Sequence, residues 1–296
     1  MKLHNHLVLK LIREYRIFFA LCTPISYNEK MSIISLSPFD LSIAALLVVA
    51  LGLLSIRMKL NLARQLIIAA LRTTVQLSLI GFVLKVIFAH ANIIWISVMA
   101  FFMLLVAGYE VMNRQKRRFT GWWGFGVGGI SMFLSSFSIT ILALTLVINI
   151  EPWYEPRYAV PLLGMLLGNT MSGIAIGLDR LTQTSHERRT IIETRLMLGQ
   201  EWYEAIEDIR RESIRSGMIP IINAMTVAGL VSLPGMMTGQ ILAGNPPMEA
   251  VKYQILIMFL ISGGTGFGTM AAVWMGSRRL FDERQRLRPD RLKLTG

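Results

Sequence analysis

Two adjacent methionines after a Pro-Gly pair are the residues of this chain best suited to bind a soft metal ion. They are Met236 and Met237, preceded by Pro234 and Gly235. Thioether sulfur is a soft, polarisable ligand, whereas a proline removes a backbone donor and breaks an apolar helix. Broken helices are tolerated in membranes where they line a cavity. We therefore expect these four residues on a translocation path, with the methionines as candidate metal ligands; packing of an apolar helix face is their alternative role.

Polar side chains inside apolar stretches form a second candidate group. Arg72 and Gln76 are four residues apart, so they share one helix face. An arginine at the centre of a bilayer costs about 2.5–3.5 kcal/mol, and Arg72 should therefore face protein or water. Asn169 is neutral and fits either a bond between helices or a contact with a solute. All three are candidate path residues; because Arg72 repels a bare cation, it either pairs with a buried carbonyl or meets an anionic metal complex.

Several other kinds of chemistry are excluded by what the chain contains. A lone Cys22 allows neither a disulfide within the chain nor a cysteine-based metal cage, and the four histidines have no ligand spacing. No segment matches the G-x-x-x-x-G-K-[ST] pattern of a phosphate-binding loop. We expect no cofactor bound by this chain and no enzymatic activity of its own.

Seven long apolar stretches must position these residues, in a chain that is 53% hydrophobic and only 16% charged. A helix needs roughly 20 apolar residues to cross a bilayer, and a backbone in lipid must satisfy its own hydrogen bonds. The sequence predicts an all-α, polytopic bundle of about seven spanning helices. Glycines four residues apart, such as Gly173 with Gly177 and Gly264 with Gly268, predict close helix contacts. The stretches are 39–56, 65–89, 91–111, 121–149, 158–178, 217–243 and 251–276.

The net charge of +12 is concentrated in alternate connections. Of 30 Lys and Arg, 21 lie in four segments, whereas the connections 90–92, 151–157 and 244–252 hold two in total. This positive-inside pattern predicts an N-terminus outside and a C-terminus in the cytoplasm. Basic residues at the inner face attract anionic lipid, so the charge indicates a lipid bilayer and no nucleic acid. The four segments are 57–64, 112–118, 179–216 and 277–296.

Residues 1–38 do not fit this topology, because they place five basic residues on the outer side. Translation from Met31 would leave a short neutral N-terminus and is the interpretation we favour; an amphipathic helix on the membrane surface is the alternative. The predicted organisation is an N-terminal extension at 1–38, a transmembrane domain at 39–276 with a cytoplasmic coupling segment at 179–216, and a basic cytoplasmic tail at 277–296.

The cytoplasmic segment 179–216 is a candidate for docking another protein. Gly199 can adopt the positive φ that ends a helix, and an apolar stripe at helical spacing follows it. An apolar stripe with a charged rim suits a docked helix. Adhesion to a lipid surface is the alternative, which the eight acidic residues of the segment oppose. The stripe consists of Trp202, Ala205, Ile206 and Ile209.

The spacing of Glu193, Gly199 and Ile209 resembles the cytoplasmic loop of ABC importer permeases. The two alanines that follow the glutamate in that family are Thr194 and Arg195 here, and its late Leu-Pro is absent. The resemblance implies a short coupling helix that sits in a groove of a separate ATPase subunit.

Three longer segments resemble the FetB-type iron-export permease family. They are Gly229–Ile255 (GLVSLPGMMTGQILAGNPPMEAVKYQI), Arg72–Lys85 (RTTVQLSLIGFVLK) and Ile209–Pro220 (IRRESIRSGMIP), and the likeness covers most of 31–280. It implies a permease subunit in a bacterial inner membrane, paired as a homodimer and driven by a cytoplasmic ABC ATPase that uses ATP and Mg²⁺. Iron is the implied cargo; plant relatives are linked to aluminium tolerance. The alternative is a stand-alone secondary transporter or channel, although such folds usually carry repeats and intramembrane carboxylates.

Overall fold

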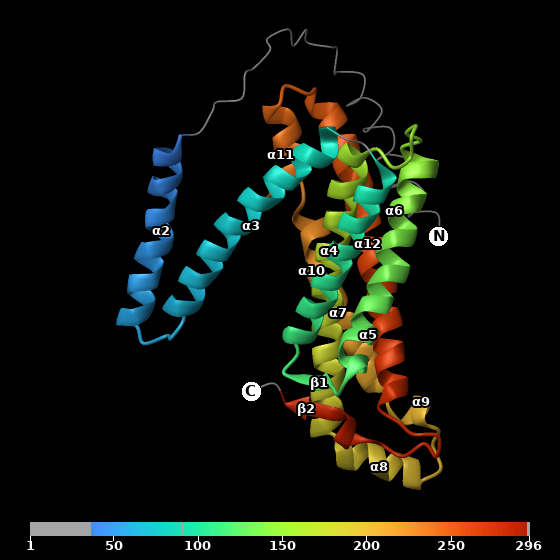
Figure 1. Ribbon diagram of the computed structural model, residues 1–296. Helices are drawn as coiled ribbons and strands as arrows, with labels where there is room; N and C mark the ends of the chain where they lie inside the picture. The colour runs from blue at the N-terminus through green and yellow to red at the C-terminus, as the bar shows by residue number, and fades with distance from the viewer. Residues whose placement is uncertain (1–36, 90–91, 295–296) are drawn as a thin grey trace, which may run out of the picture. The chain divides into compact units, whose positions relative to one another are not determined.

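The computed structural model describes residues 37–89 and 92–294 (Figure 1). Within them, six helices are long and apolar enough to cross a membrane, which confirms the predicted all-α, polytopic class. Met31 and nearly all of the predicted extension at 1–38 lie outside the described residues. The six spans are Phe39–Arg57, Ala63–Ala89, Ile93–Asn113, Trp122–Val147, Pro156–Glu187 and Pro247–Arg279.

The described residues divide into two compact units. The smaller unit contains Pro234–Gln254, and the larger unit contains 37–233 and 255–294. The larger unit begins with a helical hairpin, because α2 (Pro38–Arg57) packs against α3 (Ala63–Ala89). A capping box starts α2: the hydroxyl of Ser37 accepts from the N–H of Asp40, and the Asp40 carboxylate accepts from the N–H of Ser37 at 2.8 Å. Such reciprocal bonds satisfy the free donors of a helix start.

The centre of the larger unit is α7 (Pro156–Glu187), which packs against α4 (Ile93–Asn113) and α10 (Glu207–Val227). Its partners also include the span at 122–147, in which two α-helical and two π-helical segments alternate. π-Helical turns are rare and often mark functional places in a helix. The segments of this span are α5 (Trp122–Met132), η1 (Phe133–Phe137), α6 (Ser138–Leu142) and η2 (Ala143–Val147).

Glycines let α7 approach both α10 and α12 (Pro247–Arg279) closely. A Cβ atom added at Gly173 would lie 2.6 Å from the Thr265 side chain, and one at Gly217 would lie 2.6 Å from the Gly173 carbonyl oxygen. At Gly268 the added atom would lie 2.6 Å from the Thr170 side chain. The predicted close helix contacts are confirmed here, because no larger residue fits without moving a helix.

The expected seventh span at 217–243 is interrupted. Helix α10 ends at Val227, and the chain resumes helical structure only in α11 (Gly235–Leu242), which belongs to the smaller unit. Between them Gly229 has φ +81° and the bridge Ala228–Ser232 holds a tight turn. The predicted break is confirmed, but it begins before Pro234. Because the helix has already ended at Val227, Pro234 acts as the N-cap of α11.

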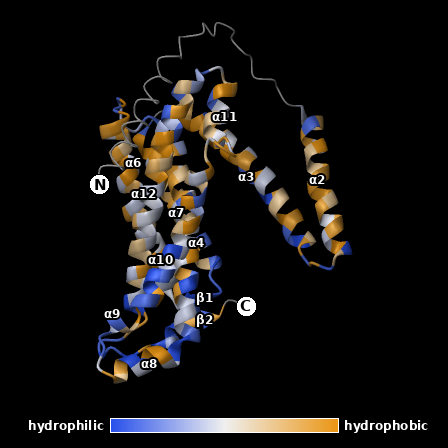
Figure 2. Cartoon of the chain, turned by 180° about the vertical axis from the view of Figure 1, so that it is seen from behind, coloured by the Kyte–Doolittle hydropathy of each residue, from blue (hydrophilic) through white to orange (hydrophobic). Residues whose placement is uncertain are grey.

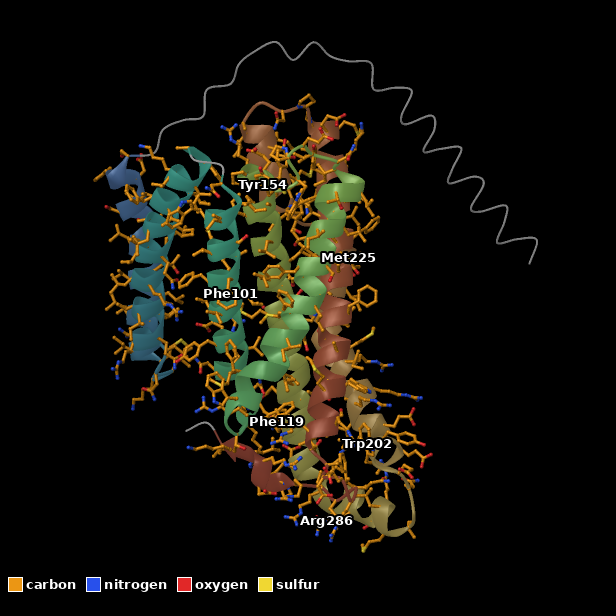
Figure 3. All side chains as sticks on the ribbon, turned by 45° about the vertical axis from the view of Figure 1, so that its right-hand side comes forward. Phe101, Phe119, Tyr154, Trp202, Met225 and Arg286 are labelled. Atoms are coloured by element: carbon orange, nitrogen blue, oxygen red, sulfur yellow. The ribbon has the colours of Figure 1, made fainter. Side chains whose placement is uncertain are left out.

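The basic segments 112–118, 179–216 and 277–294 come together at one end of the larger unit, which we call the basic end. Strand β1 (Arg117–Phe119) pairs antiparallel with β2 (Leu292–Leu294). Figure 3 shows Phe119, Trp202 and Arg286 at this end and Tyr154, from the 151–157 connection, at the other. Figure 2 shows hydrophilic segments gathered at the basic end. The remaining elements of the basic end are α8 (Arg189–Met197), α9 (Trp202–Ala205) and η3 (Pro289–Arg291).

Candidate functional site

The predicted coupling segment is mostly helical. Helix α7 continues through Asp179 to Glu187, and α8 follows after a one-residue break. Gly199 ends α8 with φ +87°, and its N–H donates to the carbonyl of Leu196 at 3.0 Å. A positive φ is accessible to glycine without a Cβ penalty, so the glycine has the conformation that we expected. Glu193 accepts a hydrogen bond from Arg189 at 2.7 Å on the same helix.

The apolar stripe after Gly199 lies in the interior of the chain itself. Ala205 and Ile206 are fully buried and Ile209 is 2% exposed, within the core that also contains Leu280 and Phe281. This corrects the role expected for the stripe, since residues covered by the chain itself are not available to another protein. The sequence pattern was amphipathic, but its apolar face packs into a core that includes Leu280 and Phe281, directly after α12.

An ion pair fastens α8 to the first turn of α10. Arg195 donates to both carboxylate oxygens of Asp208, at 2.8 and 3.3 Å, and to the carbonyl of Ala205 at 2.9 Å. The Arg195 guanidinium lowers the pKa of Asp208 below its usual range, and the Asp208 carboxylate raises the pKa of Arg195. Bidentate pairs of this kind fix geometry as well as charge. The two helices are therefore held in one orientation.

The segment after α12 forms a strap across α9. The N–H of Trp202 donates to the side-chain oxygen of Gln285 at 2.9 Å, and the Trp202 ring lies 5.8 Å from that of Phe281. Asp282 closes the strap by accepting from the N–H and the side chain of Arg286 at 2.9 Å, which lowers its pKa. The predicted basic tail at 277–296 thus packs against α9 through residues 281–286.

Two apolar side chains at the tip of α8 remain uncovered. Met197 and Leu198 are each 80% exposed. Met197 borders a pocket of about 780 Å³ between the end of α8 and the strap, with Glu193, Glu201 and Arg284 among its other lining residues. Exposed apolar groups rimmed by charge mark an interaction surface. Met197 and Leu198 at the end of α8 are therefore a candidate interaction surface of this segment.

A chain of polar contacts links α3, α4 and α7. Arg72 donates to Glu110 at 2.9 Å, Arg114 lies 4.0 Å from the same carboxylate, and Arg114 donates to the hydroxyl of Ser172 at 3.4 Å. Arg72 lies about 14 Å along α3 from its start, by the rise of an α-helix. The partner of Arg72 is therefore a carboxylate of this chain. The buried carbonyl expected from the sequence is not the partner observed, and the contact with an anionic complex stays a prediction.

The other expected path residues do not all join this chain of contacts. Gln76 lies one turn beyond Arg72 on α3 and is exposed. Asn169 lies one turn before Ser172 on α7, where its side chain donates to the Met165 carbonyl of its own helix at 2.9 Å. It therefore does not bridge helices through that donor. Arg72 and Asn169 stand on neighbouring helices of the larger unit.

The Pro-Gly-Met-Met group belongs to the smaller unit. Pro234 is the N-cap of α11, Gly235 is its first residue, and Met236 and Met237 are half-buried in its first turn. Among the described residues, no group of three or more His, Cys, Asp or Glu could hold a metal ion. Methionine is not one of those four residue types, so the metal role of the two methionines stays a prediction.

Sequence reasoning missed three features that matter at this site. The pair of Glu110 with Arg72 joins two helices and had no sequence signal, whereas the position of Glu110 four residues before Arg114 does indicate an ion pair with the neighbouring basic run. Met197 and Leu198 immediately precede the helix-ending glycine, and two apolar residues at a helix end rimmed by charge were a usable signal. Gln285 carried no signal, because its bond to Trp202 joins residues 83 positions apart.

The comparisons with known proteins agree on one family. The model of the family described as "Uncharacterised protein family (UPF0014)" matches residues 38–281. The UPF0014 membrane protein slr1647 of Synechocystis is 39% identical over 77% of this chain and 87% of the relative. Protein ALUMINUM SENSITIVE 3 of Arabidopsis thaliana is 35% identical over 78% and 83%.

A third relative has a name that states an activity. The probable iron export permease protein FetB of Escherichia coli is 31% identical over 86% of this chain and 96% of the relative. No solved structure matches the chain significantly. The resemblance drawn from residues 72–85, 209–220 and 229–255 is thereby confirmed. With a family model that matches residues 38–281 and a relative 39% identical over 77% of this chain, the chain belongs to the UPF0014 family of membrane proteins.

Proposed function

We propose that this chain is the membrane permease subunit of an ABC-type transporter that exports iron or another metal ion from a bacterial cell. Two copies pair in the inner membrane, and each takes a cytoplasmic ATPase subunit at its basic end. ATP and Mg²⁺ are used by that partner, and this chain binds no cofactor. The name of the Escherichia coli relative supports the cargo and the direction.

The observation that carries the proposal is the construction of the basic end. Helix α8 presents Met197 and Leu198 outward, while Arg195 ties the same helix to Asp208 on α10. A force applied at Met197 and Leu198 is therefore transmitted to α10 through the Arg195–Asp208 ion pair. A membrane protein that needs no partner has little use for such a braced and partly apolar projection.

The packing of α10 supports a route from the tip to the membrane interior. Helix α10 meets α7 where Gly217 and Gly173 bring the two backbones together. Ser172, adjacent to Gly173, holds Arg114 and through it Glu110 and Arg72. Interfaces this tightly packed switch between discrete arrangements and do not deform continuously. A displacement of α10 thus changes the polar contacts between α3, α4 and α7.

The Arg72–Glu110 pair removes the objection that an arginine excludes a cationic cargo. The carboxylate neutralises Arg72 while the path is empty of cargo. A metal ion that approaches Glu110 competes with Arg72 for the same oxygens, so binding of the ion and release of the arginine are one exchange. Met236 and Met237 are proposed as further ligands along the path.

Co-purification with a candidate ABC ATPase tests the docking part of the proposal. Met197→Asp with Leu198→Asp should abolish the association, because both side chains are exposed and a charge there opposes an apolar contact. Leu294→Asp is the matched control, since Leu294 is also exposed at the basic end but lies on β2. Normal association of the double variant would contradict docking through α8.

Transport in proteoliposomes tests the energy source. The chain with its ATPase should move iron only when ATP and Mg²⁺ are present, and the chain alone should not. A stand-alone transporter or channel gives the opposite result, with full transport in liposomes that contain no ATPase.

A further inference from the structure

The end of α12 gathers arginines beside exposed tryptophans. Arg278 and Arg279 are the last two residues of the helix, and Arg291 reaches them from η3 by donating to the carbonyls of Arg279 at 2.9 Å and Phe281 at 3.0 Å. The Arg279 guanidinium lies 4.7 Å from the centre of the Trp123 ring. Residues from α5, α12 and the returning tail thus meet at one place.

A pocket of about 400 Å³ lies at this meeting point. Trp123, Trp274 and Met275 line one part of it, and the three arginines line another. Asp282 and Glu283 also border the pocket. Asp282, however, is already bound by Arg286 at 2.8 Å, with Arg288 3.8 Å away. The pocket therefore combines an apolar wall with an excess of positive charge.

The positive charge of the pocket is only partly balanced within the described part of the chain, by Glu283 at its border. There, Arg278, Arg279 and Arg291 form no ion pair with any carboxylate. The Nε atom of Arg279 is buried and has no hydrogen-bond acceptor among the described residues. Buried donors in proteins are nearly always bonded, so each exception calls for an explanation. The hydrogen bonds of the Arg279 guanidinium are therefore incomplete among the described residues.

The position of the pocket identifies the source of the anion. Trp122 is 90% exposed, Trp274 is 57% exposed and Trp123 is 48% exposed, and all three lie within two turns of the ends of spanning helices. Tryptophans at that level are typical of the interface between membrane and water. The arginine-rich end is the cytoplasmic one by the positive-inside rule, and this leaflet carries the anionic lipids. A free phosphate ion would make no use of the apolar wall.

We infer that the pocket at the end of α12 binds the phosphate headgroup of an anionic phospholipid, with an acyl chain along Trp123, Trp274 and Met275. The guanidinium of Arg279, which lines the pocket, donates to the phosphate, and Arg278 and Arg291 add positive charge around it. Arg278 also lies 5.2 Å from the centre of the Trp202 ring, so a bound lipid braces the contact between α12 and α9. The inference requires only that the chain spans a membrane and is independent of the cargo.

Thermal unfolding of the full chain in detergent tests this site, with short-chain phosphatidylglycerol titrated as the probe and phosphatidylcholine of the same chain length compared. Phosphatidylglycerol should raise the unfolding temperature more than phosphatidylcholine does. Arg279→Gln should weaken the apparent affinity about five-fold, the loss expected for one basic residue at a lipid surface. Arg157→Gln is the matched control, since it removes an exposed charge at the opposite end and should change nothing.

Arg278→Gln provides a second variant if Arg279→Gln does not fold, and a similar weakening is expected. Equal stabilisation by the two lipids, or wild-type affinity in both variants, would overturn the inference. Inorganic phosphate that stabilises the chain as well as phosphatidylglycerol does would identify a free-anion site and overturn the lipid assignment.

Discussion

Arg72 is a charged residue in an apolar helix, so its presence indicates that a neighbouring helix supplies a partner. Its charge required a partner wherever the surrounding helices lay, and the partner is Glu110 at 2.9 Å. The sequence indicated the need for a partner but not its identity, because the two residues are 38 positions apart on different helices. Nothing in the spacing of one helix specifies which residue of another lies opposite.

The pair predicts a compensation between two substitutions. Glu110→Gln should lower the free energy of unfolding by up to about 3 kcal/mol, because it leaves an arginine without its carboxylate in an apolar span. Arg72→Gln combined with Glu110→Gln should recover most of that loss. Unfolding in mixed micelles measures both. Glu155→Gln is the control, since its pair with Arg157 is exposed and is worth about 0–1 kcal/mol. An equal loss in the single and double variants would show that the pair is not coupled.

The two methionines of α11 give a prediction about cargo. Replacing both Met236 and Met237 by leucine conserves volume, so the chain should fold with a stability change below about 1.5 kcal/mol. Iron efflux from loaded vesicles that contain the chain and its ATPase should fall, because two thioether ligands are lost. Met270→Leu removes a thioether from α12 without touching the Pro-Gly-Met-Met group and should leave efflux unchanged. Unaltered efflux in the double variant would discard the thioether role.

At the scale of elements, apolar length predicted the spanning helices well, because a membrane imposes a minimum length on each of them. Apolar length did not predict the structure where short local sequences determine it. The break before α11 depends on a glycine turn at Gly229, two residues after the end of α10 at Val227, and Pro234 is the N-cap of the next helix. The strap over α9 was not foreseen, because its bond from Trp202 to Gln285 joins residues far apart in the sequence. The three-residue strand β2 that follows it has no periodicity to detect.

The ion pair between α8 and α10 predicts that substitutions of Arg195 and Arg211 differ in their effect on the stability of the basic end. Arg195→Gln should destabilise the basic end by about 1 kcal/mol and speed hydrogen exchange in α8, because charged hydrogen bonds to Asp208 are lost. Arg211→Gln should have a much smaller effect, since its partner Glu207 lies on the same exposed face of α10. Both variants remove one charge from the same segment. Equal exchange rates in α8 would mean that the Asp208 pair does not hold the helix.

Asp208 also gives this link a pH dependence. Because its pKa in the folded chain is below the ordinary value of about 3.9, the pair stabilises the fold above that pH and is lost as the pH falls through the lowered pKa. The anisotropy of a fluorophore on Leu198→Cys, in a Cys22→Ser background, should therefore fall as the medium is acidified below about pH 4. In an Asp208→Asn variant the anisotropy should already be low at neutral pH. Identical curves of anisotropy against pH for the chain with Asp208 and for the Asp208→Asn variant would exclude Asp208 as the titrating group.

At the scale of the whole molecule, the alternation of charge along the chain was the most informative pattern. It predicted that the segments 57–64, 112–118, 179–216 and 277–296 lie on one side, and the structure joins the last three by hydrogen bonds over their described parts. Lys116 donates to Asp179, Trp202 to Gln285, and β1 pairs with β2. The pattern succeeds because the rule acts on the side of the membrane, which is a property of the whole chain.

The side of the membrane on which the basic end lies can be measured directly. In a Cys22→Ser background, Leu198→Cys and Glu283→Cys should react with a membrane-impermeant maleimide only after cells are permeabilised, because the positive-inside rule places the basic end in the cytoplasm. Arg157→Cys should react in intact cells, since it lies in the connection that also contains Tyr154, at the opposite end (Figure 3). Labelling of Leu198→Cys in intact cells would invert the topology. It would also remove the proposed ATPase site, because ATP is supplied on the cytoplasmic side.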